Sequence, residues 1–298
     1  MNIEQYIKDH SSVTIDGALA TELERRGCDL NCKLWSAKVL IENPEIISQV
    51  HLMYYQSAST LGLQDEGFTL GEAQSLIRKS VELANEAKKA MIVQDPTRYC
   101  FIAGSIGPHG AYLANGAEYT GEYSLSLDEM TNFHRPRMET LLESGVDLLA
   151  CETIPSYQET EALLSLLEEY SDARAWFSFT LKDESHISDG TSLATVASLL
   201  ETRPQVIAAG INCVRPDLVD GALETLSKKF TRTLIAYPNS GEDYDPSSKE
   251  WKGEATENLQ LAQWVQNWHA RGAKLIGGCC RTTPDDIKTI KEVLSPKA

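Results

Sequence analysis

The chain has 298 residues, of which 42% are hydrophobic and 23% are charged, so it contains enough apolar sequence to bury a large core. Its net charge of −16 argues against a free-standing nucleic-acid binder and against a protein of anionic membrane surfaces, because both need basic clusters. No apolar run approaches the roughly 18 residues of a spanning helix, and the amino terminus lacks the apolar core of a signal peptide. We therefore expect a cytoplasmic protein with neither nucleic-acid nor membrane partners.

Short apolar runs alternate with helix-like stretches along the whole chain. The predicted strands cover residues 13–15, 101–103, 147–153, 175–181, 206–213, 233–237 and 274–278. The predicted helices cover residues 45–57, 72–91, 127–144, 157–170, 191–201, 216–229, 257–271 and 284–294. Strands that are apolar on both faces are typical of a parallel sheet covered by helices. This order predicts one α/β domain over residues 1–298, a (β/α)8 TIM barrel.

Two features of the pattern leave the fold open at this stage. An open, doubly wound sheet is the alternative, although the turn after the first strand, Asp-Gly-Ala-Leu-Ala-Thr, lacks the glycine-rich dinucleotide fingerprint. The second strand–helix unit is weak or incomplete, because only a short strand over residues 59–63 fits before the helix that begins at residue 72. Either the barrel is distorted there, or the numbered chain lacks residues near 58–70.

Polar residues and cysteines gather where the predicted strands end. They are Asp16, Glu152, Asn212, Cys213, Asn239, Cys279 and Cys280. In a barrel these positions form one rim, from which catalytic groups come. Two long loops, 108–126 and 240–254, follow strands at the same end. Their aromatic residues are predicted either to line a pocket or merely to cap the barrel: Tyr112, Tyr119, Tyr123, Tyr244 and Trp251.

Three of the seven cysteines have the arrangement of a metal centre. Cys213 ends one apolar run, and Cys279 and Cys280 follow another after two glycines. Neighbouring side chains of a strand point to opposite faces, so both thiols can serve one centre only if the backbone leaves strand geometry, which glycine permits. Three thiolates suit zinc and leave a fourth position open for a thiol substrate. The alternative is that small, apolar cysteines pack the end of the barrel.

The remaining candidate ligands carry weaker signals. Cys28 and Cys32 form a rival pair without a second pair, and we interpret them as structural thiols. Cys100 and Cys151 lie in or beside apolar runs and are predicted core residues. His51 and His269 lie on helical stretches and are not expected to be ligands, whereas His109 and His134 are the histidines that could reach the rim.

Asp16 and Glu152 form a second constellation at the rim. A carboxylate just beyond a buried strand is costly unless it has a partner. The ammonium group of an amino-acid substrate is one such partner, and a lysine or arginine of the chain itself is the alternative. As acid–base groups beside a structural zinc, the same carboxylates would instead fit a barrel lyase.

Several segments together resemble the homocysteine S-methyltransferases over nearly the whole chain. They are DGALATELERRG from residue 16, LWSAK from 34, ENPE from 42, HRPR from 134, LLACET from 148, GINC from 210, YPNSG from 237 and GGCCRTTP from 277. The pair GINC and GGCC is the most specific. The chain looks most similar to the short bacterial branch that uses S-methylmethionine, without the folate and cobalamin modules of the large methionine synthases.

The resemblance implies an activity and a role for each rim residue. The activity is zinc-dependent methyl transfer from S-methylmethionine, or less well from S-adenosylmethionine, to the thiol of L-homocysteine, forming methionine. Cys213, Cys279 and Cys280 match the zinc ligands, Asp16 and Glu152 match positions that hold the homocysteine amino group, and Asn239 matches an asparagine close to the metal. Selenocysteine or another thiol as acceptor, and a catalytically silent binding protein, are the remaining alternatives, and the sequence does not identify any protein partner.

Overall fold

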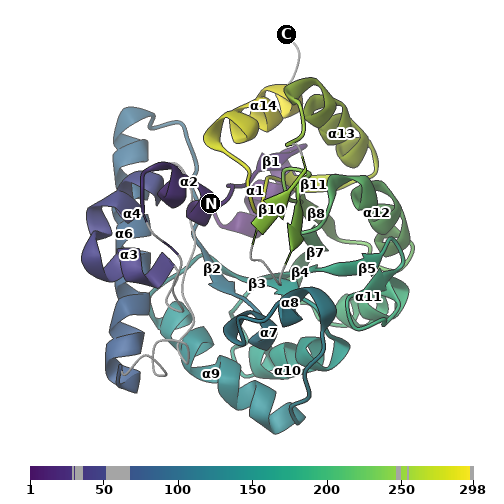
Figure 1. Ribbon diagram of the computed structural model, residues 1–298, viewed down its shortest axis with the longest axis horizontal. Helices are drawn as coiled ribbons and strands as arrows, with labels where there is room; N and C mark the ends of the chain where they lie inside the picture. The colour runs from purple at the N-terminus through teal and green to yellow at the C-terminus, as the bar shows by residue number, and fades with distance from the viewer. Residues whose placement is uncertain (29, 31–35, 52–67, 246–249, 254, 296–298) are drawn as a thin grey trace.

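The computed structural model describes residues 1–28, 30, 36–51, 68–245, 250–253 and 255–295 (Figure 1). Its main feature is a curled sheet of seven parallel strands surrounded by helices (Figure 1). The strands are β1 Val13–Thr14, β2 Ala103–Ile106, β3 Leu148–Ile154, β4 Ala175–Phe179, β7 Val206–Asn212, β8 Thr233–Tyr237 and β11 Ala273–Ile276. The order across the sheet is β1-β11-β8-β7-β4-β3-β2.

The first strand of the chain pairs with the last. Val13 of β1 lies opposite Leu275 of β11, and Thr14 lies opposite Ile276, in parallel register. A sheet whose first and last strands are neighbours curls back on itself, as the wall of a (β/α)8 barrel does. This pairing confirms the barrel prediction and excludes the open, doubly wound alternative.

The described sheet has its two edges where the second unit was expected. β1 is one edge strand and β2 is the other, and the second strand of a (β/α)8 barrel belongs between them. The weak strand predicted over residues 59–63 lies outside the described residues, as do residues 52–57 of the first predicted helix.

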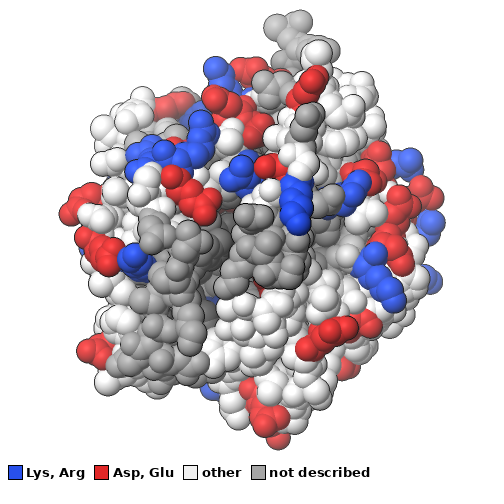
Figure 2. All heavy atoms as spheres, in the orientation of Figure 1, with Lys and Arg blue, Asp and Glu red and all other residues white. Residues whose placement is uncertain are grey.

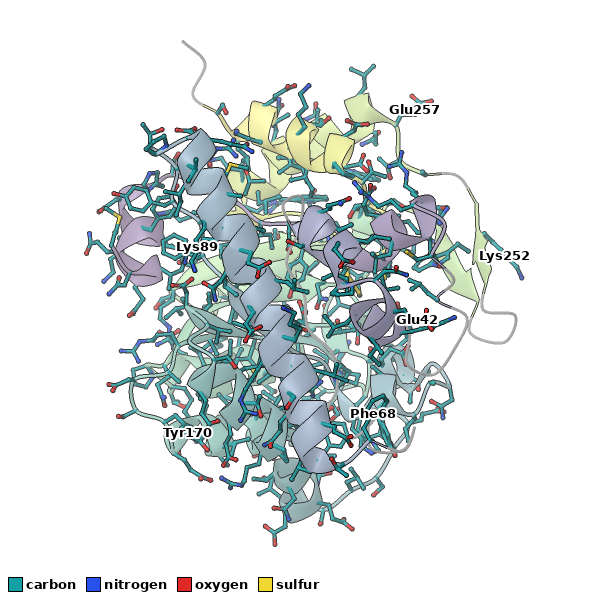
Figure 3. The ribbon with its side chains drawn as sticks, turned by 90° about the vertical axis from the view of Figure 1, so that its left-hand side faces the viewer. Glu42, Phe68, Lys89, Tyr170, Lys252 and Glu257 are labelled. Carbon is teal, nitrogen blue, oxygen red and sulfur yellow. A yellow bond between two sulfur atoms is a disulfide. The ribbon has the colours of Figure 1, made fainter. Side chains whose placement is uncertain are left out.

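Eight helices cover the outside of this sheet, close to the predicted positions. They are α4 Pro44–His51, α6 Leu70–Gln94, α9 Leu127–Glu143, α10 Tyr157–Glu168, α11 Leu193–Glu201, α12 Val219–Ser227, α13 Asn258–Ala270 and α14 Pro284–Leu294. Capping boxes fix the start of three of them, at Thr69, Ser126 and Thr283. Figure 3 shows α6, 25 residues long, running the length of one side of the molecule.

Several short elements were not predicted. They are α1 Ile3–Asp9, α2 Leu19–Arg25, α3 Ser36–Glu42, α7 His109–Tyr112, α8 Ala117–Thr120, a 3₁₀ turn Pro216–Leu218, and the hairpins β5 Leu181–Asp183 with β6 His186–Ile187 and β9 Asp243–Asp245 with β10 Glu250–Lys252. α1 has a structural role, because Ile3 and Ile7 pack with Leu148 and Trp176 inside the barrel. Of the helices in the described ranges, none is long and apolar enough to cross a membrane.

The core has two layers that place the rim residues. One cluster lies between strands and helices and contains Phe177, Phe179 and Trp268. A second cluster fills the inside of the barrel, and Cys213 and Cys279 belong to it. On the face shown in Figure 2, lysines and arginines are interspersed with acidic residues and form no continuous basic stripe.

Candidate active site

The three predicted cysteines come together at the carboxyl ends of the strands. Cys213 follows β7, and Cys279 and Cys280 follow β11, with the three sulfur atoms within 4.8 Å of one another. The Sγ atoms of Cys213 and Cys280 are 3.8 Å apart. The structure joins Cys213 to Cys279 by a disulfide, with Cα atoms 5.5 Å apart, and leaves Cys280 as a free thiol. In this respect it differs from the three separate thiols that the sequence predicted.

The backbone after β11 explains how two adjacent cysteines reach one centre. The strand ends at Ile276, and a turn closed by the N–H of Thr282 donating to the carbonyl of Cys279 (3.1 Å) follows. Positive φ angles occur at Cys213 (50°) and Arg281 (68°), and not at the two glycines to which we had assigned unusual dihedrals. The expected departure from strand geometry is therefore present, but its conformational reason was wrong.

Gly277 and Gly278 are needed for space. A Cβ atom at Gly277 would lie 2.6 Å from the backbone oxygen of Asp16, and one at Gly278 would lie 2.6 Å from Cγ2 of Thr282. The N–H of Gly278 donates to the same oxygen of Asp16 at 3.0 Å. Gly277 thus lets the cysteine segment pack directly against the end of β1, which brings Asp16 beside it, and Gly278 leaves space for Thr282.

The donor set fits a thiophilic metal once the cysteines are reduced. Two thiolates bound to zinc at about 2.3 Å in a tetrahedron are about 3.8 Å apart, and the Cys213–Cys280 separation of 3.8 Å matches this value. Burial raises the pKa of the Cys280 thiol to about 11, so a cation is needed to hold it as a thiolate near neutral pH. These three residues can therefore hold a metal ion.

Asn239 is clamped against both cysteine segments by its neighbours in the chain. All of these contacts are backbone hydrogen bonds. The N–H of Asn239 donates to the carbonyl of Val214, the N–H of Cys279 donates to the carbonyl of Pro238 (2.8 Å), and the N–H of Ser240 donates to the carbonyl of Cys280 (3.1 Å). Asn239 is 7% exposed, and within the described part of the chain nothing donates to its buried Oδ1. A buried oxygen without a donor is costly unless a cation or a ligand uses it.

Glu152 lies on β3 in a network of neutral donors. Ser105 donates to one oxygen of Glu152 (2.5 Å) and Tyr237 donates to the other (3.0 Å). Trp176 donates to the Tyr237 hydroxyl in turn (3.0 Å). Burial raises the pKa of Glu152, against the hydrogen bonds from Ser105 and Tyr237 and the charge of Arg137, which lower it.

The alternative ion pair of Glu152 is not observed. Within the described residues this carboxylate contacts no lysine or arginine within ion-pair distance, and Arg137 acts only at longer range. Asp16, at the end of β1, is half-buried. Both carboxylates thus lie at the predicted rim, and Glu152 retains the burial cost that a cationic ligand would offset.

Asn212, the residue before Cys213, contacts both the end of β3 and the cysteine centre. Its side chain accepts from the N–H of Thr153 (2.8 Å), donates to the Thr153 hydroxyl (2.8 Å), and approaches Sγ of Cys279 (3.9 Å). Thr153 has a φ of 64°, which is uncommon for a β-branched residue. The amide of Asn212 therefore holds a strained strand end beside the cysteines.

The three predicted tyrosines of the loop 108–126 divide into two groups. Tyr119, on α8, donates a hydrogen bond to Cys280 and packs against the cluster inside the barrel. Tyr123 instead donates to Glu159, and Tyr112 packs against His109 and Phe133. Tyr119 therefore lines the site, while the other two anchor the loop from which it comes.

His134 and His109 do not join the cysteine centre. His134 is fully buried and contacts Glu159 (2.8 Å) and Arg137 (3.0 Å), and the backbone N–H of His109 donates to Glu159 (2.7 Å). Cys151 is a fully buried core residue, as predicted, but Cys100, which was predicted to be one too, is only half-buried. Cys28 is half-buried, and Cys32 lies outside the described residues. Glu159 and Glu118 were not singled out in the sequence, since neither lies at a strand end.

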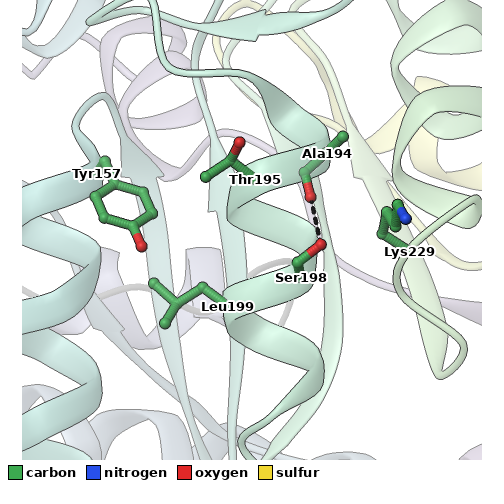
Figure 4. A pocket seen from close by; sticks show the side chains of 6 residues that line it. All are labelled: Tyr157, Ala194, Thr195, Ser198, Leu199 and Lys229. Atoms are coloured by element: carbon green, nitrogen blue, oxygen red, sulfur yellow. Dashed lines mark hydrogen bonds between the residues drawn. The ribbon is translucent and has the colours of Figure 1, made fainter.

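A separate hollow of about 490 Å³ lies among the outer helices (Figure 4). It is lined by Tyr157, Ala194, Thr195, Ser198, Leu199 and Lys229. Figure 4 shows that Ser198 uses its hydroxyl within α11, where it donates to the carbonyl of Ala194 (2.8 Å). The lining residues lie on α10 and α11 and just after α12, away from the three cysteines, so we assign the hollow no part in the chemistry.

Comparisons with known proteins agree with this geometry. The family model described as Homocysteine S-methyltransferase matches residues 13–294. The Homocysteine S-methyltransferase of Escherichia coli is 50% identical, with 93% of each chain covered. The Homocysteine S-methyltransferase YbgG of Bacillus subtilis is 46% identical, with 97% of each chain covered. That alignment runs over 306 residues, more than the 298 of this chain, so the relative carries residues that this chain lacks.

Solved structures give the same result. The homocysteine methyltransferase MmuM of Escherichia coli superposes with a TM-score of 0.87 in both its oxidized and its metallated forms, at 46% identity. The oxidized form covers 96% of this chain and 97% of the other, and the metallated form covers 97% and 98%. From the family match, the sequence identities and the shared fold, the chain belongs to the homocysteine S-methyltransferase family.

Proposed function

We propose that the chain transfers a methyl group from S-methylmethionine to the thiol of L-homocysteine, with zinc held by Cys213, Cys279 and Cys280. The observation that carries the proposal is the convergence of three cysteine sulfurs within 4.8 Å at the ends of the strands. The methyl carbon leaves the sulfonium sulfur and bonds to the homocysteine sulfur, whose proton goes to water. Two molecules of methionine result, one from each substrate.

Zinc, when bound, would lower the pKa of the homocysteine thiol and orient its sulfur at the open fourth position. Three negatively charged cysteine ligands keep the centre electron-rich, which preserves the nucleophilicity of the substrate sulfur. The disulfide between Cys213 and Cys279 must be reduced before all three can act as ligands. Asn239, whose buried Oδ1 lacks a donor among the described residues, is the residue that we place beside the metal.

The family and the chemistry of the donor favour methyl transfer over the lyase alternative. A sulfonium is already activated by its positive charge and leaves as a neutral thioether, so the enzyme needs only to activate the thiol and align the two sulfurs. A methyl group on a folate amine is much less activated. We therefore expect S-methylmethionine to be the better donor and S-adenosylmethionine a slower one.

A panel of methyl donors at fixed homocysteine tests this proposal. With reduced, zinc-loaded protein and methionine as the measured product, we expect the rate to be highest with S-methylmethionine and lower with S-adenosylmethionine. Betaine and methylfolate should give little product. Faster methylation from betaine than from either sulfonium would overturn the donor assignment, and no product from any donor would overturn the function.

Asp16 and Glu152 are proposed to bind the ammonium group of homocysteine. The unmet burial cost of Glu152 supports this role, as does the direct packing of the cysteine segment on Asp16. Removing either charge, in Asp16→Asn or Glu152→Gln, should raise the homocysteine KM about tenfold or more, as expected for a charge-assisted hydrogen bond. Zinc content should not change, because neither residue is a proposed ligand.

Asp172→Asn is the matched control, because Asp172 is exposed and precedes β4 at the opposite end of the barrel. Steady-state kinetics with homocysteine as the varied substrate should leave this variant at the wild-type KM. If both rim variants also keep the wild-type KM, the two carboxylates have a structural role only.

A further inference from the structure

Glu118 carries a buried carboxylate oxygen that the chemistry described above does not use. It lies on α8, in the loop between β2 and α9. Its carboxylate accepts from its own backbone N–H, and within the described residues nothing donates to the buried Oε2 atom. Burial raises the pKa of Glu118, against the backbone hydrogen bond, which lowers it. A carboxylate placed in this way carries a desolvation cost that a cationic ligand would offset.

The backbone around Glu118 is held by contacts on both sides. Gly110 of α7 packs so closely that a Cβ atom there would lie 2.6 Å from the backbone nitrogen of Glu118. Thr180, just after β4, donates its hydroxyl to the Glu118 carbonyl (2.8 Å), and the N–H of Gly121 donates to Ala117 (2.8 Å). Packing and hydrogen bonds to neighbouring elements therefore hold the backbone that carries the carboxylate.

Glu118 also lies beside the cysteine centre. Tyr119, the next residue, donates a hydrogen bond to Cys280, and the negative charge of Glu118 raises the pKa of the same thiol. The loop thus brings an aromatic hydroxyl into contact with Cys280 and a carboxylate close enough for its charge to act on the same thiol.

We propose that Glu118 binds the positively charged sulfonium group of the methyl donor and so selects a cationic donor. This inference rests on the proposed methyl transfer. A sulfonium has no N–H to donate, so it is recognised by charge and not by hydrogen bonds. A buried oxygen that lacks a donor, carried by the residue next to Tyr119, matches that requirement, as Oε2 of Glu118 does.

The loss of positive charge on the donor sulfur during the reaction predicts which kinetic constant depends on Glu118. The sulfonium loses its positive charge as the methyl group leaves, so a carboxylate attracts the donor more strongly in the ground state than in the transition state. Such an interaction contributes to donor binding and does not accelerate the chemical step. Glu118 is therefore expected to lower the KM for the donor without raising kcat.

The test compares wild type with Glu118→Gln, which keeps the shape and removes the charge. With reduced, zinc-loaded protein, we expect the KM for S-methylmethionine to rise about tenfold or more, with kcat unchanged or slightly higher. Methionine has the same carbon chain as S-methylmethionine but a neutral sulfur. It should therefore inhibit both proteins equally well in competition with the donor. Equal weakening of methionine and S-methylmethionine would instead indicate a structural role and overturn the proposal.

Glu24→Gln is the control, because the charge of Glu24 also raises the pKa of Cys280 but its side chain is exposed. This variant should keep the wild-type donor KM, and a rise equal to that of Glu118→Gln would show a general effect of negative charge. If wild type is active and Glu118→Gln has wild-type constants, only the role of Glu118 fails. If wild type itself forms no methionine, the proposed function fails.

Discussion

Replacement of Cys280 by alanine is expected to abolish zinc binding and methyl transfer together while the barrel stays folded. Cys280 is the free thiol of the centre and one of the three proposed zinc ligands. Changes to groups that only support a metal ligand reduce affinity or activity by about 10–100-fold, so loss of a ligand should cost more than about 100-fold. The apolar core of a 298-residue barrel forms without the metal, so the far-UV circular dichroism should not change.

Zinc per chain and the initial rate of methionine formation should be measured on the same preparation. Cys100→Ala provides the matched control, because Cys100 is a half-buried free cysteine that precedes β2 at the opposite end of the barrel. It should keep full zinc and full rate. A Cys280→Ala protein that retains one zinc and wild-type turnover would show that the ligand assignment is wrong.

The barrel was predictable because its signals are local and repeated. Short, mostly apolar runs such as 206–212 are typical of strands covered on both faces, and this one is buried at every position. Their alternation with helices then restricts the topology. The pairing of β1 with β11 was not visible in the sequence, because two residues of β1 carry too little pattern to reveal a partner near the other end of the chain.

Short elements were not predicted, because they too contain too few residues to show a pattern. α1 and α8, with seven and four residues, are too short to show a helical period, and tertiary contacts stabilise them. α1 is recognisable afterwards from Asn2, whose side chain caps the helix, and from Ile3 and Ile7 one turn apart, which enter the barrel interior. The sequence signal existed, but nothing in it indicated what the apolar pair would contact.

The rim of the barrel was predicted more fully than the groups that surround it. Strand-end residues can be identified by position, which is why the sequence alone predicts Cys213, Glu152 and Asn239 at the rim. Glu118 lies in an irregular loop, and only the packing of Gly110 and Thr180 on its backbone places it near Cys280. Such contacts cannot be predicted from the position of a residue along the sequence.

Glu159 shows a further limit of sequence reasoning. It is fully buried on α10 and accepts from His134, Tyr123 and the backbone of His109. Despite its burial, its pKa is lowered, because these hydrogen bonds and the charge of His134 outweigh desolvation. The network joins the loop that carries Tyr119 to α9 and α10, and a glutamate in an amphipathic helix gave no indication that it would be buried.

Metal removal and restoration is the second change with a large expected effect. Reduced protein treated with a chelator should lose its methyltransferase activity, because without the metal the homocysteine thiol is mostly protonated near neutral pH. The fold should persist, which circular dichroism of the metal-free protein checks. Activity should then return in proportion to added zinc.

The most direct measurement is the rate of methionine formation from homocysteine and S-methylmethionine as zinc is added back to reduced, metal-free protein. We predict a linear rise that ends at one zinc per chain for wild type and no rise for Cys280→Ala. Full activity in the metal-free protein, or restoration of Cys280→Ala by the same zinc, would contradict a catalytic centre built on Cys213, Cys279 and Cys280.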